Sequence, residues 1–300
     1  MLTPALQFAV SLIFVYLLLS ALSSAIQEIV ANLAKWRSNT LETAITNMLG
    51  DSSFKDKIYQ HALLKGVWRP NWLFMEVKKV HKPAYISSSM FAQAVQDLRT
   101  APGATLPAVT QQVLDAVVKG AANAEEERKK IEHWFDDAMD GVSGWYKRKA
   151  NAWLWVISAL VCVALNADTI SVGKILWNDP TARAAVSEAA KNYATHKAAN
   201  DAGTNATTPA EVKDELSRVT KARDDLEKLP VPLGWCKEDC LPDDPRRPPT
   251  AFYPLLLKFI GLLISVLAVS QGAPFWFDLL QKAVNLRLAG DPPPDSRAQK

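Results

Sequence analysis

Three long stretches of apolar residues constrain this chain more than any other feature of its sequence. The first covers residues 2–27, the second residues 150–167 and the third residues 253–270, and Lys258 is the only charged residue within them. A transmembrane helix needs about 20 apolar residues, because the hydrocarbon core of a bilayer is about 30 Å thick. The sequence therefore predicts an all-α membrane protein with three transmembrane helices.

Each apolar stretch has a competing interpretation. The first resembles the core of a cleaved signal peptide, but no Lys or Arg precedes it and it exceeds the usual length of about 7–15 residues. We therefore expect an uncleaved first transmembrane helix, with its extension, over residues 1–34. The second stretch is short, so a buried core helix over 150–167 is the alternative to a span. In the third, Lys258 lies near one end, where its ammonium can extend to the headgroups; a functional charge within the membrane is the alternative.

The distribution of charge predicts an orientation. Residues 35–149 carry 17 Lys and Arg against 13 Asp and Glu, whereas residues 168–250 carry 12 against 14. Because cytoplasmic loops are enriched in Lys and Arg, we expect the first segment inside, the second outside, the N-terminus outside and the C-terminus in the cytoplasm. Cys236 and Cys240 fall in the outer segment, where a disulfide between them would persist.

The segments between the spans favour helices. A helical cytoplasmic domain is predicted over 35–149, with glycine helix stops at Gly50 and Gly66 and one helix running toward the membrane from residue 124. Residues 168–252 predict an extracytoplasmic helical hairpin followed by a Pro-rich loop. Residues 271–290 predict an amphipathic helix that lies in the membrane interface, with Trp276 as an anchor, or that packs on the cytoplasmic domain. Residues 291–300 predict a disordered tail.

The stretch FDDAMDGVSGWYKRKANAWLW, residues 135–155, raises the question of an acidic site. Asp136 and Asp140 are four residues apart on one helix face with Asp137 beside them, and carboxylates at that spacing can share a divalent cation. Enzymes of prenyl chains use such aspartates in two facing clusters, and the predicted topology offers no second cluster on the same side. We favour a solvated helix face that softens at a glycine turn before the membrane. The residues that would anchor it at the headgroups are Trp145, Lys147, Arg148 and Lys149.

Other sites are disfavoured by residue spacing. The net charge of +3 is too small to favour nucleic acid. The four histidines have no metal-ligand spacing, and the sequence contains neither a Walker A loop nor GxGxxG. The CxxxC spacing of Cys236 and Cys240 is not that of a CxxC redox pair, so it favours a structural disulfide. We therefore assign no catalytic residue, metal ligand or cofactor site from the sequence.

Four stretches carry a resemblance: KPAYISSSMFAQAVQDL, FDDAMDGVSGWYKR, ALNADTISVGKILWNDPTARAA and AVSQGAPFWFDLLQKAVNLR. Together they resemble an uncharacterised family of bacterial inner-membrane proteins. The resemblance implies a multi-pass protein of the bacterial inner membrane with a similar layout of spans, and it implies no activity.

The leading hypothesis is an inner-membrane anchor or scaffold without catalysis, whose cytoplasmic helical domain recruits a protein partner that the sequence does not identify. The alternative is a channel-like or membrane-perturbing effector, which would have to form a homo-oligomer because three short spans cannot enclose a pore. A third hypothesis is a membrane-embedded enzyme acting on lipid or isoprenoid through Asp136, Asp137 and Asp140. The lipid bilayer is a partner under each hypothesis.

Overall fold

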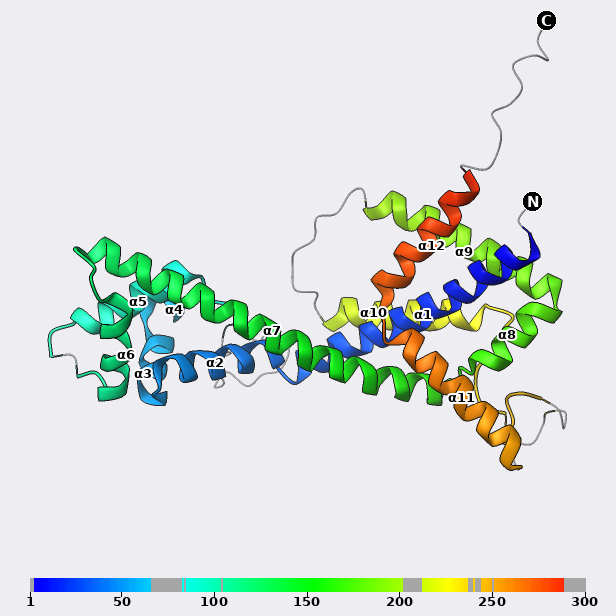
Figure 1. The fold of residues 1–300 in the computed structure, drawn as a ribbon, viewed down its shortest axis with the longest axis horizontal. Coiled ribbons are helices and arrows are strands. Elements are labelled where there is room, and N and C mark those ends of the chain that lie inside the picture. Colours follow the sequence, from blue (N-terminus) through cyan, green and yellow to red (C-terminus); the bar gives the residue numbers. More distant parts are fainter. Residues whose placement is uncertain are drawn as a thin grey trace, which may run out of the picture. The chain divides into compact units, whose positions relative to one another are not determined.

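The computed structural model describes residues 3–65, 83, 85–103, 105–201, 212–236, 240, 244–249 and 251–288. Over these residues the chain is built from α-helices and contains no strand (Figure 1). The predicted disordered tail, 291–300, lies outside the described residues. The helices are α1 Pro4–Leu33, α2 Trp36–Leu49, α3 Ser52–Gln60, α4 Ala62–Lys65, α5 Ser88–Thr100, α6 Ala108–Val118, α7 Ala124–Ala164, α8 Thr169–Asn178, α9 Pro180–Asp201, α10 Val212–Glu227, α11 Phe252–Val269 and α12 Ala273–Leu288.

The chain forms two compact units. Unit 1 comprises residues 1–30 and 151–300, and unit 2 comprises residues 31–150. Each unit has its own cluster of buried apolar side chains. Helix α7 contributes to both units, because its first part belongs to unit 2 and its apolar last part to unit 1.

Unit 2 encloses its core between α2, α3, α5, α6 and the first part of α7. The rings of Phe91 and Phe135 are fully buried and stack with their centroids 4.4 Å apart. Apolar burial of this kind stabilises a fold by about 25 cal/mol per Å². Because the side chains of this core all belong to unit 2, the core is independent of the apolar spans. The other side chains of this core that are essentially inaccessible to solvent include Ile45, Leu49, Phe54, Ile58, Leu64, Leu114 and Ile131.

Local sequence signals set the helix limits in unit 2. Lys35, in the left-handed conformation at φ 52°, separates α1 from α2. Gly50 ends α2 at φ 67°, a conformation that favours glycine because it has no Cβ. The Asp51 carboxylate then caps α3 by accepting from the backbone N–H groups of Ser53 and Phe54. Gly50 is thus a helix stop, as the sequence predicts, whereas Gly66 lies outside the described residues.

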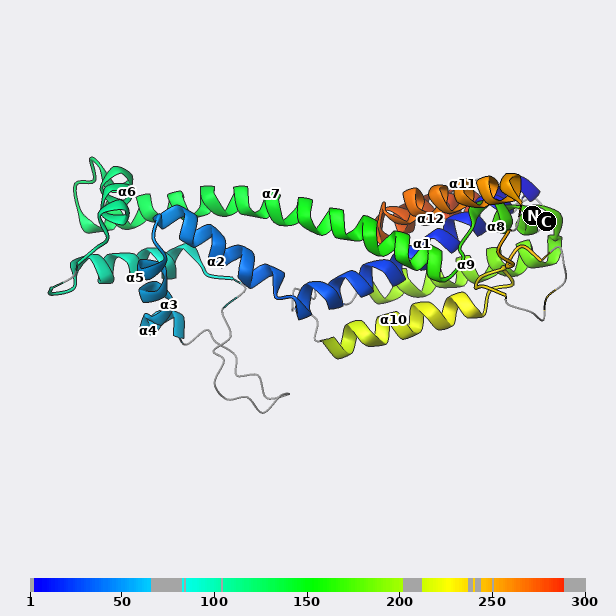
Figure 2. The same ribbon diagram turned by 90° about the horizontal axis from the view of Figure 1, so that it is seen from below.

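Helix α1 is the central element of unit 1. Figure 2 shows it between the α11–α12 pair on one side and the α9–α10 pair on the other. Its partners account for the burial of more than half (56%) of its most apolar window. The contacts include a hydrogen bond of 3.1 Å from Ser11 Oγ to Arg183 O on α9, and an edge-on pairing of the Phe14 and Tyr193 rings. An arm of the predicted extracytoplasmic hairpin therefore packs along the first apolar helix, an arrangement that the sequence does not indicate.

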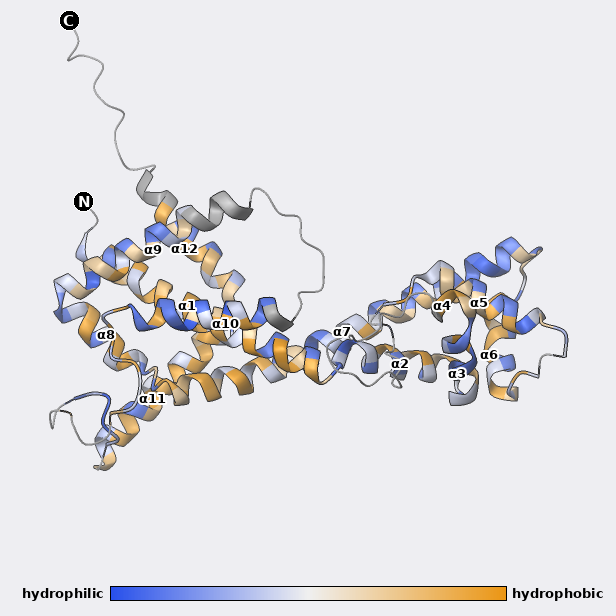
Figure 3. Cartoon of the chain, turned by 180° about the vertical axis from the view of Figure 1, so that it is seen from behind, coloured by the Kyte–Doolittle hydropathy of each residue, from blue (hydrophilic) through white to orange (hydrophobic). Residues whose placement is uncertain are grey.

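Helix α11 and the end of α7 present apolar residues outward. Only 22% of the most apolar window of α11 is buried by other parts of the chain. Figure 3 shows these apolar stretches in orange. A patch of this extent is unusual on a soluble monomer and is expected on a helix that faces lipid. Its exposed members are Trp153, Trp155, Val156, Leu160 and Val163 on α7, and Phe252, Tyr253, Leu255, Leu256, Phe259, Ile260, Leu263, Ile264 and Leu267 on α11.

In the described part of the chain, α1 and α11 are each long and apolar enough to cross a membrane. A third crossing is counted only if α7 and α8, which are bent by 56° at the break between them, form one span. The all-helical fold, with at least two helices long and apolar enough to span a membrane, agrees with the sequence analysis. The structure differs from the predicted helix over 150–167: one helix runs through Gly141 and Gly144, where a softened turn was expected, and ends at Ala164.

The C-terminal helix α12 packs against other helices of unit 1. Leu280 is fully buried and Phe277 nearly so, within the apolar core of unit 1. The helix packs on α9, and the Trp276 ring lies 4.8 Å from that of Tyr16 on α1. Part of the apolar face of α12 is thus covered by helices of unit 1, and its place in a membrane interface stays a prediction.

Candidate functional site

The break between α7 and α8, residues 165–168, combines a left-handed residue with a buried helix cap. Asn166 adopts the left-handed conformation at φ 48°, which turns the chain out of α7. Asp168 then restarts the helix: one of its carboxylate oxygens accepts from Ile170 N at 2.9 Å and the other from Ser171 Oγ at 2.6 Å. A carboxylate that accepts from the first free N–H groups of a helix is a stabilising N-cap. Asp168 is buried, so these bonds replace the hydrogen bonds with water that burial removes.

A second segment, of which residues 231–236, 240 and 244–247 are described, closes the end of α7. The last carbonyls of a helix have no partner within the helix, and here Leu165 O accepts from Gly234 N at 2.6 Å while Val163 O accepts from Trp235 Nε1 at 2.6 Å. In return, the Asn166 side-chain amide donates to Gly234 O at 3.0 Å. We call this segment the loop clip, because it joins the end of α7 to the region that precedes α11.

Lys258 on α11 holds the other end of the loop clip. Its ammonium donates to Pro245 O at 2.7 Å and to Arg247 O at 3.3 Å, and it lies 4.7 Å from the centre of the Trp235 ring. The side chain is buried, and the carboxylates of Asp168 and Asp244 attract it. From the sequence, snorkelling and a functional charge are both open for Lys258. The structure gives it a third role, because a cation in contact with carbonyl oxygens and an aromatic face stabilises a folded loop.

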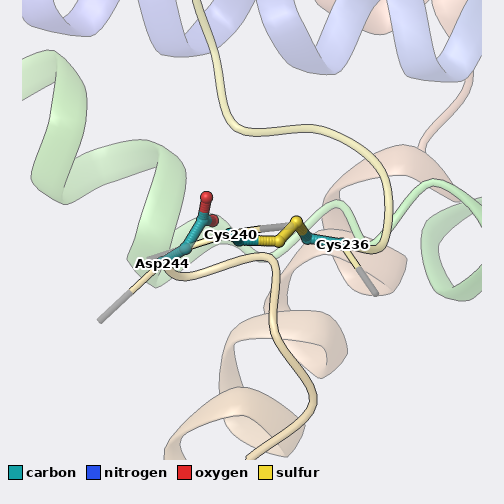
Figure 4. Close-up of side chains that lie close together, drawn as sticks. All are labelled: Cys236, Cys240 and Asp244. Carbon is teal, nitrogen blue, oxygen red and sulfur yellow. A yellow bond between two sulfur atoms is a disulfide. The ribbon is translucent and has the colours of Figure 1, made fainter. Parts of the chain in front are cut away.

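The predicted disulfide lies within the loop clip. Figure 4 shows Cys236 and Cys240 joined, with the Asp244 carboxylate beside Cys240. The ligand atoms of these three residues lie within 4.8 Å of one another, a spacing suited to a metal ion. The two sulfurs are bonded to each other, however, and both Asp244 oxygens accept from the Arg246 guanidinium, at 2.7 to 3.2 Å. That pairing lowers the pKa of Asp244 to about 2. The group as it stands is therefore a disulfide next to an ion pair and fits no metal ion.

A chain of hydroxyl groups connects three helices beside the break. Tyr16 OH on α1 lies 2.9 Å from Thr169 Oγ1 on α8, and Thr169 Oγ1 lies 2.6 Å from Ser265 Oγ on α11. Ser265 Oγ in turn donates to Gly261 O at 3.0 Å. Hydrogen bonds between helices replace the water that a membrane interior lacks. We call these groups, together with Asp168, the polar junction.

The space next to the polar junction is closed. A narrow gap between α1, α8 and α11 has no room for a water molecule. In this conformation the polar junction joins the three helices. The residues that line the gap are Leu12, Val15, Tyr16, Leu19, Ala167, Thr169, Val172 and Ser265.

The predicted acidic residues lie elsewhere, on the part of α7 that belongs to unit 2. Asp136, Asp137 and Asp140 are all exposed. Within the described ranges, none of them joins other side chains in an arrangement that could hold a metal ion. The three carboxylates occupy a solvated helix face.

The residues predicted as membrane-interface anchors lie in both units. Lys147, Arg148 and Lys149 are exposed on α7, and Trp145 is 53% exposed. Trp276 is only partly exposed, and its Nε1 donates to Ala268 O at 2.7 Å, at the end of α11. Trp276 thus contributes to the turn between α11 and α12 within unit 1.

The polar junction and the loop clip were not predicted from the sequence. Asn166 and Asp168 directly follow the second apolar stretch, and an Asp before an apolar helical pattern is a helix-start signal. That signal could have located α8. Nothing in the sequence pairs Gly261 with Asp168 or Trp235 with Lys258, because their contacts join segments far apart in the chain.

Comparison with known proteins adds no relative: no family model matches the chain, and neither a curated protein nor a solved structure matches it.

Proposed function

We propose that this protein is an integral membrane anchor that presents the helical unit 31–150 and recruits a protein partner through it. One observation carries the proposal: unit 2 has a complete apolar core of its own, yet it shares the continuous helix α7 with the apolar part of the chain. A unit with an independent core can keep a stable binding surface. A helix without a break between the two parts is suited to tethering that surface.

The interior of unit 1 supports an anchoring role over transport. Tyr16, Thr169 and Ser265 bond to one another, and Lys258 is held by carbonyl groups. Transport paths through membranes are lined by polar groups that face water or a ligand. Here these groups tie helices together and the adjacent gap excludes water.

Helix α6 offers positions at which recruitment can be tested. Leu114 and Val118 point into the core of unit 2, whereas Val109 and Gln112 are exposed. A photo-crosslinking amino acid would be placed at Val109 or Gln112, and at Phe259 on α11 as a lipid-facing control. At native expression we expect an adduct of defined mass, identified by mass spectrometry, from the α6 positions and none from the control.

The absence of any protein adduct across the exposed positions of unit 2 would refute recruitment. The channel-like alternative has a separate test in liposomes that contain the purified protein. A scaffold leaves an imposed potassium gradient intact, and a leak that grows with protein density would favour the channel instead.

A further inference from the structure

The start of α2 and the middle of α7, both in unit 2, meet through contacts between cations and aromatic rings. Arg37 Nε donates to Tyr146 OH at 3.3 Å, and its guanidinium carbon lies 5.8 Å from the centre of the Tyr146 ring. The Lys149 ammonium lies 5.3 Å from the centre of the buried Trp36 ring. These rings hold one cation from each helix close to the other helix.

Five exposed cations gather around this junction, which we call the basic junction. Lys35 directly precedes α2 and Arg37 lies in its first turn, whereas the other three are consecutive residues of α7. The junction directly precedes the apolar part of α7, which begins at residue 150, and it follows the end of the apolar helix α1. Its members are Lys35, Arg37, Lys147, Arg148 and Lys149.

The cations of helix α7 differ in whether a carboxylate lies close to them. Far from the apolar part, Arg128 pairs with Glu125 at 2.9 Å and with Glu132 at 3.5 Å. In the described part of the chain, by contrast, no carboxylate lies within ion-pair distance of Lys147, Arg148 or Lys149. Consecutive like charges without counter-charges repel one another, so Lys147, Arg148 and Lys149 are suited to an anion that the described part of the chain does not supply.

We propose that the basic junction binds the phosphodiester head group of an anionic phospholipid. A guanidinium donates two parallel hydrogen bonds to phosphate oxygens, and the lysines add positive charge around it. Basic pockets beside membrane helices bind anionic head groups in this way. The apolar part of α7 that follows would lie along the acyl chains, which selects a lipid over a soluble phosphate.

The chain contains its own matched control, because the dipeptide Arg-Lys occurs twice on α7. Arg148→Gln with Lys149→Gln removes two charges from the basic junction. Arg128→Gln with Lys129→Gln removes the same two charges from the carboxylate-paired region. The full-length protein in neutral detergent would be titrated with phosphatidylglycerol or phosphatidylcholine, and bound lipid would be counted by native mass spectrometry.

We expect the unchanged protein and the control variant to prefer phosphatidylglycerol, and the junction variant to lose roughly 10- to 30-fold in affinity for it, at about 1 kcal/mol per cation. The preference should weaken as salt is raised. Equal binding of the two lipids by the unchanged protein would overturn the proposal, as would equal losses in the two variants.

Two further measurements keep the result interpretable. Glycerol phosphate at millimolar concentration should not displace the lipid; if it does, the site is one for soluble phosphate and the assignment to a lipid is wrong. Each variant loses contacts of a cation, Lys149 with Trp36 in one and Arg128 with its glutamates in the other, so both should show a similar small fall in Tm and a difference in binding between them reports on charge. Because recruitment is measured separately by crosslinking on α6, either proposal can fail alone.

Discussion

Replacing Gly261 by alanine tests the polar junction more sharply than any other single substitution. A Cβ built on Gly261 would overlap Oδ1 of Asp168 and would lie 2.8 Å from its Cγ. The Asp168 carboxylate cannot move away without giving up its bonds to Ile170 N and Ser171 Oγ. One added methyl group therefore perturbs α11 and the start of α8 together.

The expected magnitude follows from three terms. Losing the N-cap costs about 1 kcal/mol, and forcing a methyl group into filled space costs about 2 kcal/mol. Alanine in place of glycine within a helix stabilises the helix by about 1 kcal/mol. The net loss of about 2 kcal/mol should lower Tm by roughly 4–8 °C, at about 2–4 °C per kcal/mol for a domain of this size.

The buried thiol of Cys162 provides the assay. It is the free cysteine on the apolar part of α7, within the core of unit 1. A thiol-reactive fluorescent dye added during heating reports when this core opens. Gly173→Ala on α8 is the control, because the nearest atom to its added Cβ is Phe8 Cζ at 4.0 Å, an ordinary contact. Without a clash, this control should raise Tm by a few degrees.

The central expectation is that Gly261→Ala lowers Tm and that Gly173→Ala raises it. If Gly261→Ala raised Tm as Gly173→Ala does, the close approach of Gly261 to Asp168 would be refuted. A double-mutant cycle adds a second check, because Asp168→Ala removes the group that the new methyl meets. The combined variant should then lose less stability than the two single losses added together, and strict additivity would contradict the contact.

Three other predictions concern single side chains. Trp235→Phe keeps the ring beside Lys258 but removes the donor to Val163 O, so the Cys162 assay should show a loss of about 1 kcal/mol; an unchanged Tm would mean that the loop clip does not hold α7. Burial raises the pKa of Glu215, although Arg218 partly offsets this. A carboxyl group whose pKa is raised on folding lowers the stability of the fold once the pH exceeds its pKa in the unfolded chain, which is about 4.3. Glu215→Gln should therefore raise Tm near neutral pH but not near pH 4, and the same gain at both pH values would contradict that reasoning. The Tyr59 hydroxyl is buried with no hydrogen-bond partner in the described part of the chain, so Tyr59→Phe should leave hydrogen exchange in α3 unchanged or slower, whereas faster exchange would point to a partner for the hydroxyl.

Much of the fold could be read from the sequence, because it depends on local patterns. Runs without charge indicate apolar helices, and the turn at Gly50 follows from its residue type. The candidate disulfide could be named because only two cysteines lie in the same polar segment. Helix α8 was missed, since its ten residues after Asp168 were included in the segment 168–252 predicted as a helical hairpin and a Pro-rich loop.

The sequence by itself determined which segments are apolar, which are charged and where helices end, because burial of an apolar face and helix capping depend on residues near one another in the chain. Only the tertiary structure decided that Gly261 makes room for Asp168, that Lys258 holds the loop clip, and that Arg37 and Lys149 share one surface. These contacts join residues far apart in sequence, and which of them form depends on how several helices pack at once. Periodicity along one helix carries no information about the partner on another.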